Sequence, residues 1–375
     1  MEFSIDTDEL TKGLYRAQGI VEKKTAMPIL SNVLIEARSD GRVVVTATDL
    51  EVGVSGEHEA DVSSPGSITI SARHLYDIIR SLPKGTVDIE RMDNHWARIK
   101  SNVEGRKIEY KMMGMSPEDF QILPDVSKAK LFKVEPGVLK NMIEKTSYAV
   151  SNDETRYNLN GAYLESHGNG EFRMVATDGH RLSMLDSKLC EQQEGFSSEA
   201  GVIIPRKGLL EIKRLLDDVK NECMMGLDGS NLIFKMDNVS VVMRLIDGKF
   251  PDYKHVIPSK QKIEITLERK KLMDSFRRIS ILSNDKNLGI RIILEDDSLK
   301  ISTSNPDLGE AVEELEVEGI DEKITIGFNT KYLLDALSSI DTEKVLVSFE
   351  DDLSPCMIRP TSEEKYTCVV MPMRI

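Results

Sequence analysis

The sequence has few of the residues that mark several common protein classes. Its four cysteines are scattered and form no CxxC pair, which argues against a disulfide framework or a zinc site and predicts reduced thiols. No apolar run approaches the roughly 20 residues of a membrane helix, and the first residues do not resemble a secretory signal. We therefore expect a cytoplasmic protein with no membrane partner. Aromatic residues make up only 5% of the chain, so an aromatic platform for base stacking is poorly supported.

The motifs of nucleotide-binding and metal-dependent enzymes are also missing. There is no P-loop and no HExxH spacing, so we predict no cofactor, no metal and no catalytic activity. Two arrangements leave alternatives open. Asp178 and His180 could form the acid–base pair of a hydrolase, although no nucleophile accompanies them. The run Glu295–Asp297 could bind a divalent cation or be a solvated loop.

Net positive charge is absent as well. The chain has 49 Lys and Arg against 63 Asp and Glu, a net charge of −14 over 375 residues. Taken as a whole, this balance argues against a nucleic-acid-binding protein, because phosphate binding needs clustered cations. The length indicates two or three domains.

The most informative feature of the sequence is a threefold repeat. The segment Val45–Leu50 recurs at Met174–Gly179 and, more weakly, at Ile301–Asn305, so that Asp49, Asp178 and Asn305 are almost evenly spaced along the chain. A β-branched strand and an amphipathic helix follow each copy. This period is too long for a solenoid, so we predict three copies of one α+β domain with mostly antiparallel strands. The predicted domains are 1–125, 129–258 and 259–375.

Charge is divided unequally between the predicted helices and the rest of the chain. The six helices carry a net charge of +8, and the remainder carries −22. They are predicted at 8–24, 72–82, 136–147, 206–220, 268–282 and 330–340. Each basic face could be a solvated surface, but a recurrence at equivalent positions favours an anionic partner.

The fifth predicted helix shows this arrangement best. Leu272, Phe276 and Ile279 share one face, which we expect to pack on a sheet. The opposite face carries four cations repeated at a spacing of seven residues, Lys270, Lys271, Arg277 and Arg278.

Four runs resemble one known family. Met27–Asn32, Ala176–Leu182, Gly248–Tyr253 and Val370–Ile375 are similar to segments of the bacterial DNA polymerase III β subunit, the sliding clamp, in the same order and over the whole chain. The resemblance implies a head-to-tail homodimeric ring, with helices lining a central hole and antiparallel sheets outside. Duplex DNA would thread this hole without sequence-specific contacts, and the ring would make the polymerase processive.

The resemblance also implies residues that contact DNA or the second copy of the chain. The family DNA contacts correspond to Lys24, Arg73, Tyr157, Arg206 and Lys207, to which the charge argument adds the four cations of the fifth helix. Ile281 and Leu282 correspond to interface residues of the dimer, the alternative being ordinary core packing.

A pocket between the second and third domains is implied for short linear peptides. Its partners would be the polymerase III alpha subunit, the clamp loader delta subunit, and other polymerases and repair proteins. Without the resemblance, Val369–Met373 would be an ordinary final strand, and the whole chain could be a monomeric scaffold that binds proteins only. His255 stands where the family often has arginine. The matching positions are Leu159, Thr177, Gly179, His180, Arg181, Leu182, Pro251, Val256, Asn329, Tyr332, Leu353, Val369, Val370, Met371, Pro372, Met373 and Arg374.

Overall fold

The chain folds into two compact units in a computed structural model. The structure describes residues 1–21, 26–103, 105–124, 126, 129–191, 196, 201–217, 222–258, 260–283, 288–318 and 323–374. The first unit contains Met1–Pro136, Gln192–Ser197 and Leu210–Leu245. The second contains Gly137–Glu191, Ser198–Leu209 and Ile246–Ile375.

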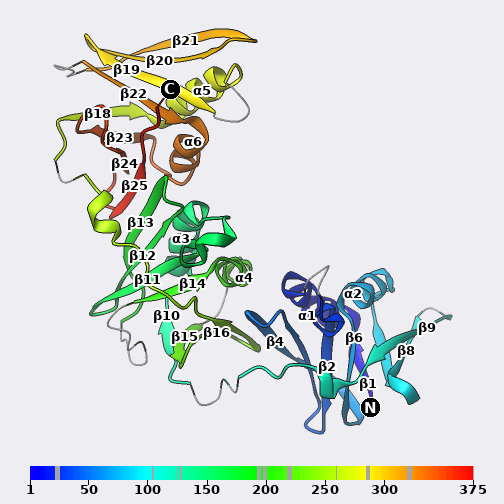
Figure 1. The fold of residues 1–375 in the computed structure, drawn as a ribbon. Coiled ribbons are helices and arrows are strands. Elements are labelled where there is room, and N and C mark those ends of the chain that lie inside the picture. Colours follow the sequence, from blue (N-terminus) through cyan, green and yellow to red (C-terminus); the bar gives the residue numbers. More distant parts are fainter. Residues whose placement is uncertain are drawn as a thin grey trace. The chain divides into compact units, whose positions relative to one another are not determined.

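One sheet of 13 strands runs through the first unit (Figure 1). Its strand order is β10-β15-β16-β17-β4-β3-β2-β6-β9-β8-β7-β1-β5, and neighbouring strands are antiparallel. The pairing of β17 with β4 joins strands of the first and second repeats that lie far apart in the sequence. The strands are β1 Glu2–Asp6, β2 Asn32–Arg38, β3 Arg42–Thr48, β4 Val52–Glu59, β5 Asp61–Ser64, β6 Gly66–Ser71, β7 Thr86–Arg91, β8 Trp96–Val103, β9 Arg106–Met115, β10 Phe132–Val134, β15 Cys223–Asp228, β16 Asn231–Met236 and β17 Val239–Arg244.

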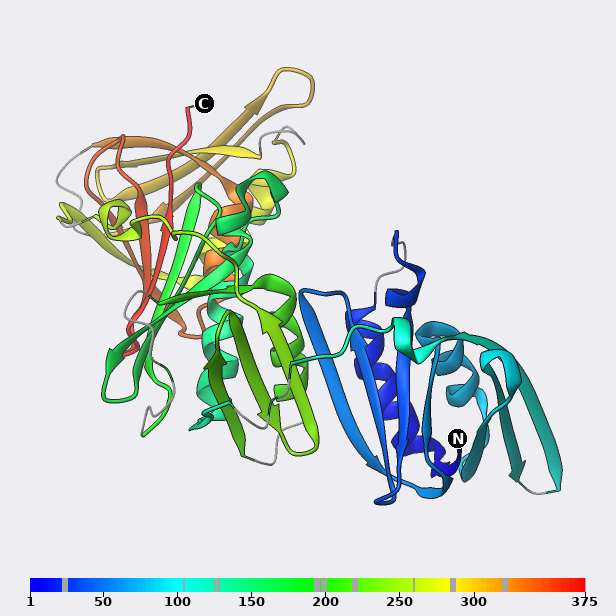
Figure 2. The same cartoon turned by 60° about the horizontal axis from the view of Figure 1, so that its bottom comes forward.

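Two helices pack against this sheet (Figures 1 and 2). Helix α1 (Thr7–Ile20) contacts β3 and β4, and α2 (Ala72–Ser81) contacts β2 and β6. The carboxylate of Asp6 accepts two hydrogen bonds from backbone N–H groups of the first turn of α1, which explains where this helix begins. Leu10 and Leu14 point into the core at the spacing of one helical face.

The second unit contains two further antiparallel sheets. An eight-stranded sheet has the order β14-β11-β12-β13-β25-β24-β23-β18, and a four-stranded sheet has the order β21-β20-β19-β22. The pairing of β13 with β25 joins strands of the second and third repeats. The strands are β11 Gly161–Gly168, β12 Glu171–Thr177, β13 Arg181–Lys188, β14 Val202–Pro205, β18 Ile263–Glu268, β19 Gly289–Glu295, β20 Ser298–Asn305, β21 Gly309–Glu316, β22 Ile324–Asn329, β23 Lys344–Phe349, β24 Cys356–Pro360 and β25 Tyr366–Val370.

The remaining helices complete the repeat. Helix α5 buries Leu272, Phe276 and Ile279, as its periodicity predicts, and it packs against α6. The other helices are α3 Pro136–Thr146, α4 Arg206–Leu216, α5 Arg269–Ser280 and α6 Thr330–Ser338, with short 3-10 helices at Pro28–Ser31, Asp93–His95, Pro117–Asp119, Ser147–Ala149, Glu154–Leu159 and Tyr253–Val256. All six predicted helices are therefore present. The first ends at Ile20, earlier than predicted, because Val21 already has an extended backbone; residues 24 and 220 themselves lie outside the described residues.

A repeated turn shows the internal similarity at the level of single bonds. The carboxylate of Asp49 accepts hydrogen bonds from the backbone N–H groups of Glu51 and Val52. Asp178 makes the same two bonds in the second repeat. Leu50 has φ +79° and Gly179 has φ +89°, so both copies use the left-handed conformation at the same place. The predicted α+β class is confirmed.

Candidate peptide pocket, nucleic-acid contacts and dimer edges

The turn between β12 and β13 is organised by Asp178. Its carboxylate accepts hydrogen bonds from the backbone N–H groups of His180 (2.9 Å) and Arg181 (3.1 Å) and from Nε of Arg181 (3.0 Å). The Thr177 hydroxyl donates to the Arg181 carbonyl, and Gly179 supplies the positive φ. Both carboxylate oxygens of Asp178 are thus occupied by the turn, which leaves the hydrolase alternative without a geometric basis.

Arg181 is almost fully buried and ties three segments of the second unit together. Its Nη1 lies 2.5 Å from the carboxylate of Asp335 in α6, and its Nη2 donates to the Tyr148 carbonyl at 2.7 Å. The guanidinium also lies over the rings of Tyr148 and Tyr332, at 5.3 and 4.7 Å from their centroids. With Nε bonded to Asp178, every guanidinium nitrogen has a partner. Arg181 therefore positions the side chains around it.

Three of the predicted peptide-binding residues belong to one buried apolar cluster. Leu159, Leu182 and Val369 are 7%, 2% and 1% exposed, and the last two face each other across β13 and β25. The cluster also contains Val175, Ile203, Phe250 and Tyr253. These residues form an apolar base beneath the Asp178 turn and the end of β25.

The end of the chain crosses from this turn to another strand. The backbone N–H of Met371 donates to the His180 carbonyl at 2.9 Å, and that of Met373 donates to the Gly327 carbonyl in β22 at 2.8 Å. The side chains of Met371, Pro372 and Met373 are half-buried. The alternative of an ordinary final strand therefore holds only up to Val370, where β25 ends.

The rim of this region combines aromatic and exposed apolar side chains. The His180 ring stacks on Tyr332, with centroids 6.2 Å apart and planes inclined by 12°. Val256 is 37% exposed, and Leu353, between β23 and β24, is 79% exposed. Asn329 accepts a hydrogen bond from a backbone N–H of the first turn of α6, so its side chain caps that helix.

Two other predicted positions, and the departure His255, lie at the surface of the same unit. Pro251 and Arg374 are exposed. His255, which replaces the arginine common in the family, is exposed and lies 3.1 Å from the carboxylate of Asp252. Its imidazole therefore has a neighbour within its own segment.

The predicted DNA contacts occur in both units. Arg73 is exposed on α2, Arg206 and Lys207 are half-buried in the first turn of α4, and Tyr157 is 60% exposed. Lys24 lies outside the described residues. The described members thus lie on α-helices or, for Tyr157, in the 3-10 helix Glu154–Leu159, and each has some exposed surface.

The four cations of α5 are all exposed, as predicted, but they differ in their neighbours. Lys270 has no ion-pair partner among the residues that the structure describes. The other three form the pairs Lys271–Glu268 (2.7 Å), Arg277–Asp274 (3.1 Å) and Arg278–Glu313 (3.0 Å). Glu313 belongs to β21, so Arg278 is held toward that strand.

The two predicted interface residues follow α5. Ile281 is 74% exposed, so the alternative of ordinary core packing does not hold for it, whereas Leu282 is half-buried. Single exposed apolar side chains are common on protein surfaces, so the place of Ile281 in a dimer interface stays a prediction.

Two of the longer strands have an edge whose backbone N–H and C=O groups are not hydrogen-bonded to another strand within the described residues. β9 pairs with β8 over Arg106–Met113, whereas β6 joins it only at Gly114 and Met115. β21 pairs with β20 alone. β9 carries three basic residues and one acidic residue, and β21 carries four glutamates and no basic residue. One of these free edges is therefore basic and the other is acidic.

The acidic run after β19 is a hairpin turn. Asp296 and Asp297 both have positive φ, at +50° and +58°, and connect β19 to β20. Glu295 forms an ion pair with Lys323. In the described part of the chain, no group of three His, Cys, Asp or Glu side chains is placed to hold a metal. No described helix is long and apolar enough to cross a membrane.

Sequence reasoning missed Tyr148 and Asp335, the partners of Arg181. Asp335 is remote from Arg181 in the sequence, and no local pattern connects them. Tyr253 was seen only as part of a motif, although its ring is in the buried cluster. The aromatic spacing of Phe250 and Tyr253 was the signal available for it.

Comparison with known proteins places the whole chain in one family. Sequence models of the N-terminal, central and C-terminal domains of the DNA polymerase III beta subunit match residues 1–124, 133–252 and 254–374. The beta sliding clamps of Pseudomonas aeruginosa and Escherichia coli are 36% and 32% identical to it, over all of both chains. The crystal structure of the P. aeruginosa subunit matches with a TM-score of 0.92 at 36% identity, covering 100% of each chain. The Bacillus subtilis clamp matches with a TM-score of 0.92 at 30% identity, covering 100% of this chain and 99% of that one. The chain therefore belongs to the family of the bacterial DNA polymerase III beta subunit, the beta sliding clamp, a non-catalytic factor of DNA replication built from three clamp domains.

Proposed function

We propose that two copies of this chain form a head-to-tail ring that encircles duplex DNA in the cytoplasm and tethers the replicative polymerase. Family membership supports the role in processivity. The observation that carries the ring is the pair of free strand edges of opposite charge, the basic β9 and the acidic β21.

The two edges are complementary in hydrogen bonding as well as in charge. An unpaired edge is a ready template for another strand, and pairing β9 of one copy with β21 of the next would satisfy both sets of backbone groups. Opposite charge favours this pairing over β9 with β9 or β21 with β21. Because each copy carries both edges, two identical junctions close a ring of two. Ile281 and Leu282 are proposed to add apolar contact at this junction.

The basic helices are proposed to face the DNA. Phosphate contacts carry no sequence information, and a topological link needs only weak contacts, so such a ring could slide. Surface ion pairs such as those of α5 contribute little stability, so phosphates could replace their carboxylates. The proposed contacts remain Lys24, Arg73, Tyr157, Arg206, Lys207, Lys270, Lys271, Arg277 and Arg278.

The region around the Asp178 turn is proposed to bind linear peptides. Its buried base of Leu182 and Val369 and its half-buried Met371 and Met373 offer apolar, adaptable surface at the junction of the second and third repeats. The partners proposed from the family are the polymerase III alpha subunit, the clamp loader delta subunit, and other polymerases and repair proteins.

The ring is tested by topology. We expect a particle of twice 42.1 kDa that stays on nicked circular DNA after loading and is lost when the circle is cut. Equal loss from the circular and the linear template would refute the ring. A monomer that binds peptides but not DNA would support the scaffold alternative instead.

The edge pairing is tested by charge exchange. Replacing Glu310 and Glu314 of β21 with lysine should weaken the dimer, and so should replacing Lys107 and Lys111 of β9 with glutamate. Combining the two changes should restore association, because opposite charges then face each other again. Failure of the combined variant to recover would argue against this pairing.

The pocket is tested separately from the ring. Ending the chain at Val370 should abolish binding of a peptide from the polymerase alpha subunit while the dimer persists. Peptide affinity that survives the truncation would contradict the pocket assignment.

A further inference from the structure

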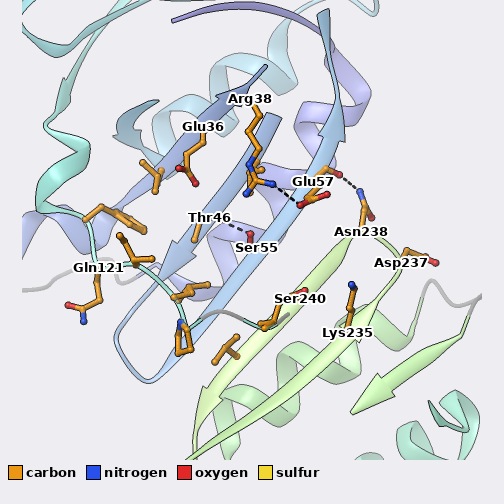
Figure 3. A pocket seen from close by; sticks show the side chains of 18 residues that line it. Glu36, Arg38, Thr46, Ser55, Glu57, Gln121, Lys235, Asp237, Asn238 and Ser240 are labelled. Atoms are coloured by element: carbon orange, nitrogen blue, oxygen red, sulfur yellow. Dashed lines mark hydrogen bonds and ion pairs between the residues drawn. The ribbon is translucent and has the colours of Figure 1, made fainter. Parts of the chain in front are cut away.

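The first unit contains a hollow of about 350 Å³ that the function above does not use (Figure 3). The hollow lies on the face of the sheet opposite α1. Side chains alternate along β4, and His58 points toward Gly13 of α1, so Ser55 and Glu57 point to the other face. Five residues on neighbouring strands form its floor, and each faces the next across a strand pair. In order they are Leu34, Thr46, Ser55, Ser240 and Lys235.

The floor is hollow because its central residues are small. Thr46, Ser55 and Ser240 present hydroxyl groups where a sheet usually places larger side chains. The segment Phe120–Pro124 forms one wall, with Leu123 directly over Gly53. The opposite end is polar, where Arg38 and Asn238 both contact Glu57 (Figure 3).

The second unit shows what the same position can hold. When the Asp49 turn is aligned with the Asp178 turn, Leu34, Thr46 and Ser55 of the floor have equivalents in the second unit. These are Tyr163, Val175 and Met184 in the same order, and they face one another across the strands in the same way. Tyr253, which follows Phe250 in the chain, belongs to the same buried apolar cluster as Val175. Tyr163 stacks on Phe250, with centroids 5.0 Å apart, and it also contacts Tyr253 at 6.4 Å. Large aromatic side chains therefore fill the position that is hollow in the first unit.

The phenol of Tyr253 also has a defined partner. Its O–H donates to Oε1 of Glu165 at 2.5 Å, and Nη1 of Arg173 lies 3.3 Å from the phenol oxygen. Burial raises the pKa of Tyr253 to about 12, so the donor keeps its proton at neutral pH.

The equivalent of Glu165 in the first unit is Glu36, which lines the hollow. Glu36 is half-buried, and its carboxylate has no hydrogen bond or ion pair among the described residues. An ionised carboxylate only accepts hydrogen bonds, so Glu36 offers an acceptor to a donor group that enters the hollow. The chain does not supply one here, because Leu123 occupies the place in the segment that Tyr253 has in the second unit.

We propose that this hollow binds the side chain of a tyrosine in a linear peptide of a partner protein. The ring lies over Thr46 and Ser55, and the phenol O–H donates to Glu36, as Tyr253 does to Glu165. At the other end of the floor, the ammonium group of Lys235 has no partner within the described residues and is available to a carbonyl or carboxylate of the peptide. The site lies wholly in the first unit and is independent of the proposed peptide pocket.

Two capped pentapeptides test the proposal on the full chain, one with a central tyrosine between alanines and one with phenylalanine in its place. Ligand-observed NMR titration should show the tyrosine peptide binding on the order of tenfold more tightly, the factor expected for a hydrogen bond to a charged acceptor. Glu36→Ala should remove this preference. Equal affinity of both peptides for the unaltered chain would overturn the assignment of the donor.

A matched pair of variants tests the location. Ser55→Met introduces the residue of the second unit and should abolish binding by filling the hollow, whereas Ser55→Ala should retain it. Tyrosine-peptide binding that survives Ser55→Met in a folded dimer would overturn the site. If Ser55→Met does not fold, loss of the tyrosine preference in Glu36→Ala decides. Free p-cresol that binds as tightly as the peptide would overturn the choice of a peptide as occupant.

Discussion

A buried histidine makes the stability of the first unit depend on pH in a way that can be worked out. The side chain of His58 is 1% exposed beneath α1, and neither ring nitrogen has a hydrogen-bond partner in the described part of the chain. Burial lowers its pKa below the usual 6.5. Glu9 acts in the opposite direction, but its carboxylate is 3.6 Å from Nδ1, and the charges of Arg16 and Lys12 lower the pKa further.

The sign and size of the effect follow from proton linkage. Well above pH 6.5 the imidazole is neutral in the folded and unfolded states, so it adds no pH dependence. Below pH 6.5 the unfolded chain takes up a proton that the folded chain resists, so the free energy of unfolding falls as the pH falls. The slope is about 1.4 kcal/mol per pH unit until the folded pKa is reached, or up to about 2 kcal/mol by pH 5.

Urea unfolding followed by circular dichroism at pH 7.5, 6 and 5 measures this loss. His58→Leu is the matched control, because leucine has a similar volume and cannot take up a proton. Carboxylates titrate in both proteins, and a fixed protein concentration keeps any contribution from association equal. The unaltered chain should lose more than the variant between pH 7.5 and 5, by up to about 2 kcal/mol. Equal losses would refute a lowered pKa for His58.

Three further predictions follow from single contacts. Asp335→Ala removes the carboxylate that lies 2.5 Å from Arg181, so it should lower the free energy of unfolding by about 2 kcal/mol and weaken peptide binding measured by fluorescence anisotropy. Unchanged peptide affinity would contradict the positioning role of Arg181. Gly13→Ala would place a Cβ 2.5 Å from Nε2 of His58 and should cost about 1–3 kcal/mol in thermal unfolding, so an unaltered midpoint would mean that α1 moves away freely. Ile281→Asp should raise the dissociation constant of the dimer at least tenfold in analytical ultracentrifugation, and an unchanged constant would exclude this residue from the interface.

Local patterns in the sequence predicted the elements of the fold well. The face of α5 that buries Leu272, Phe276 and Ile279 follows from their spacing alone, because a helix places every third or fourth residue on one side. The repeat located equivalent turns at Asp49 and Asp178, since a carboxylate two residues before free N–H groups stabilises such a turn wherever it occurs. These features depend on neighbours in the chain and need no knowledge of remote contacts.

The same patterns could not assign partners to side chains that lie far apart in the chain. The resemblance places Arg181 among the peptide-binding positions, but no local pattern indicates that α6 buries it against Asp335. His58 reads as one polar position in a strand, and only the tertiary structure shows that it lies against Gly13 of α1 with neither nitrogen hydrogen-bonded in the described part of the chain.

By itself, then, the sequence determined the threefold repeat, the six helices with their summed positive charge, and the family. The tertiary structure decided which charges are already paired, which strand edges are free, and where a repeated position is filled or hollow. Ser55 and Met184 occupy the same place in the repeat, but the space around each depends on the residues facing it across the sheet. The physical reason is that periodicity sets which side of an element is buried, whereas strand register and packing between remote segments set what each buried group meets.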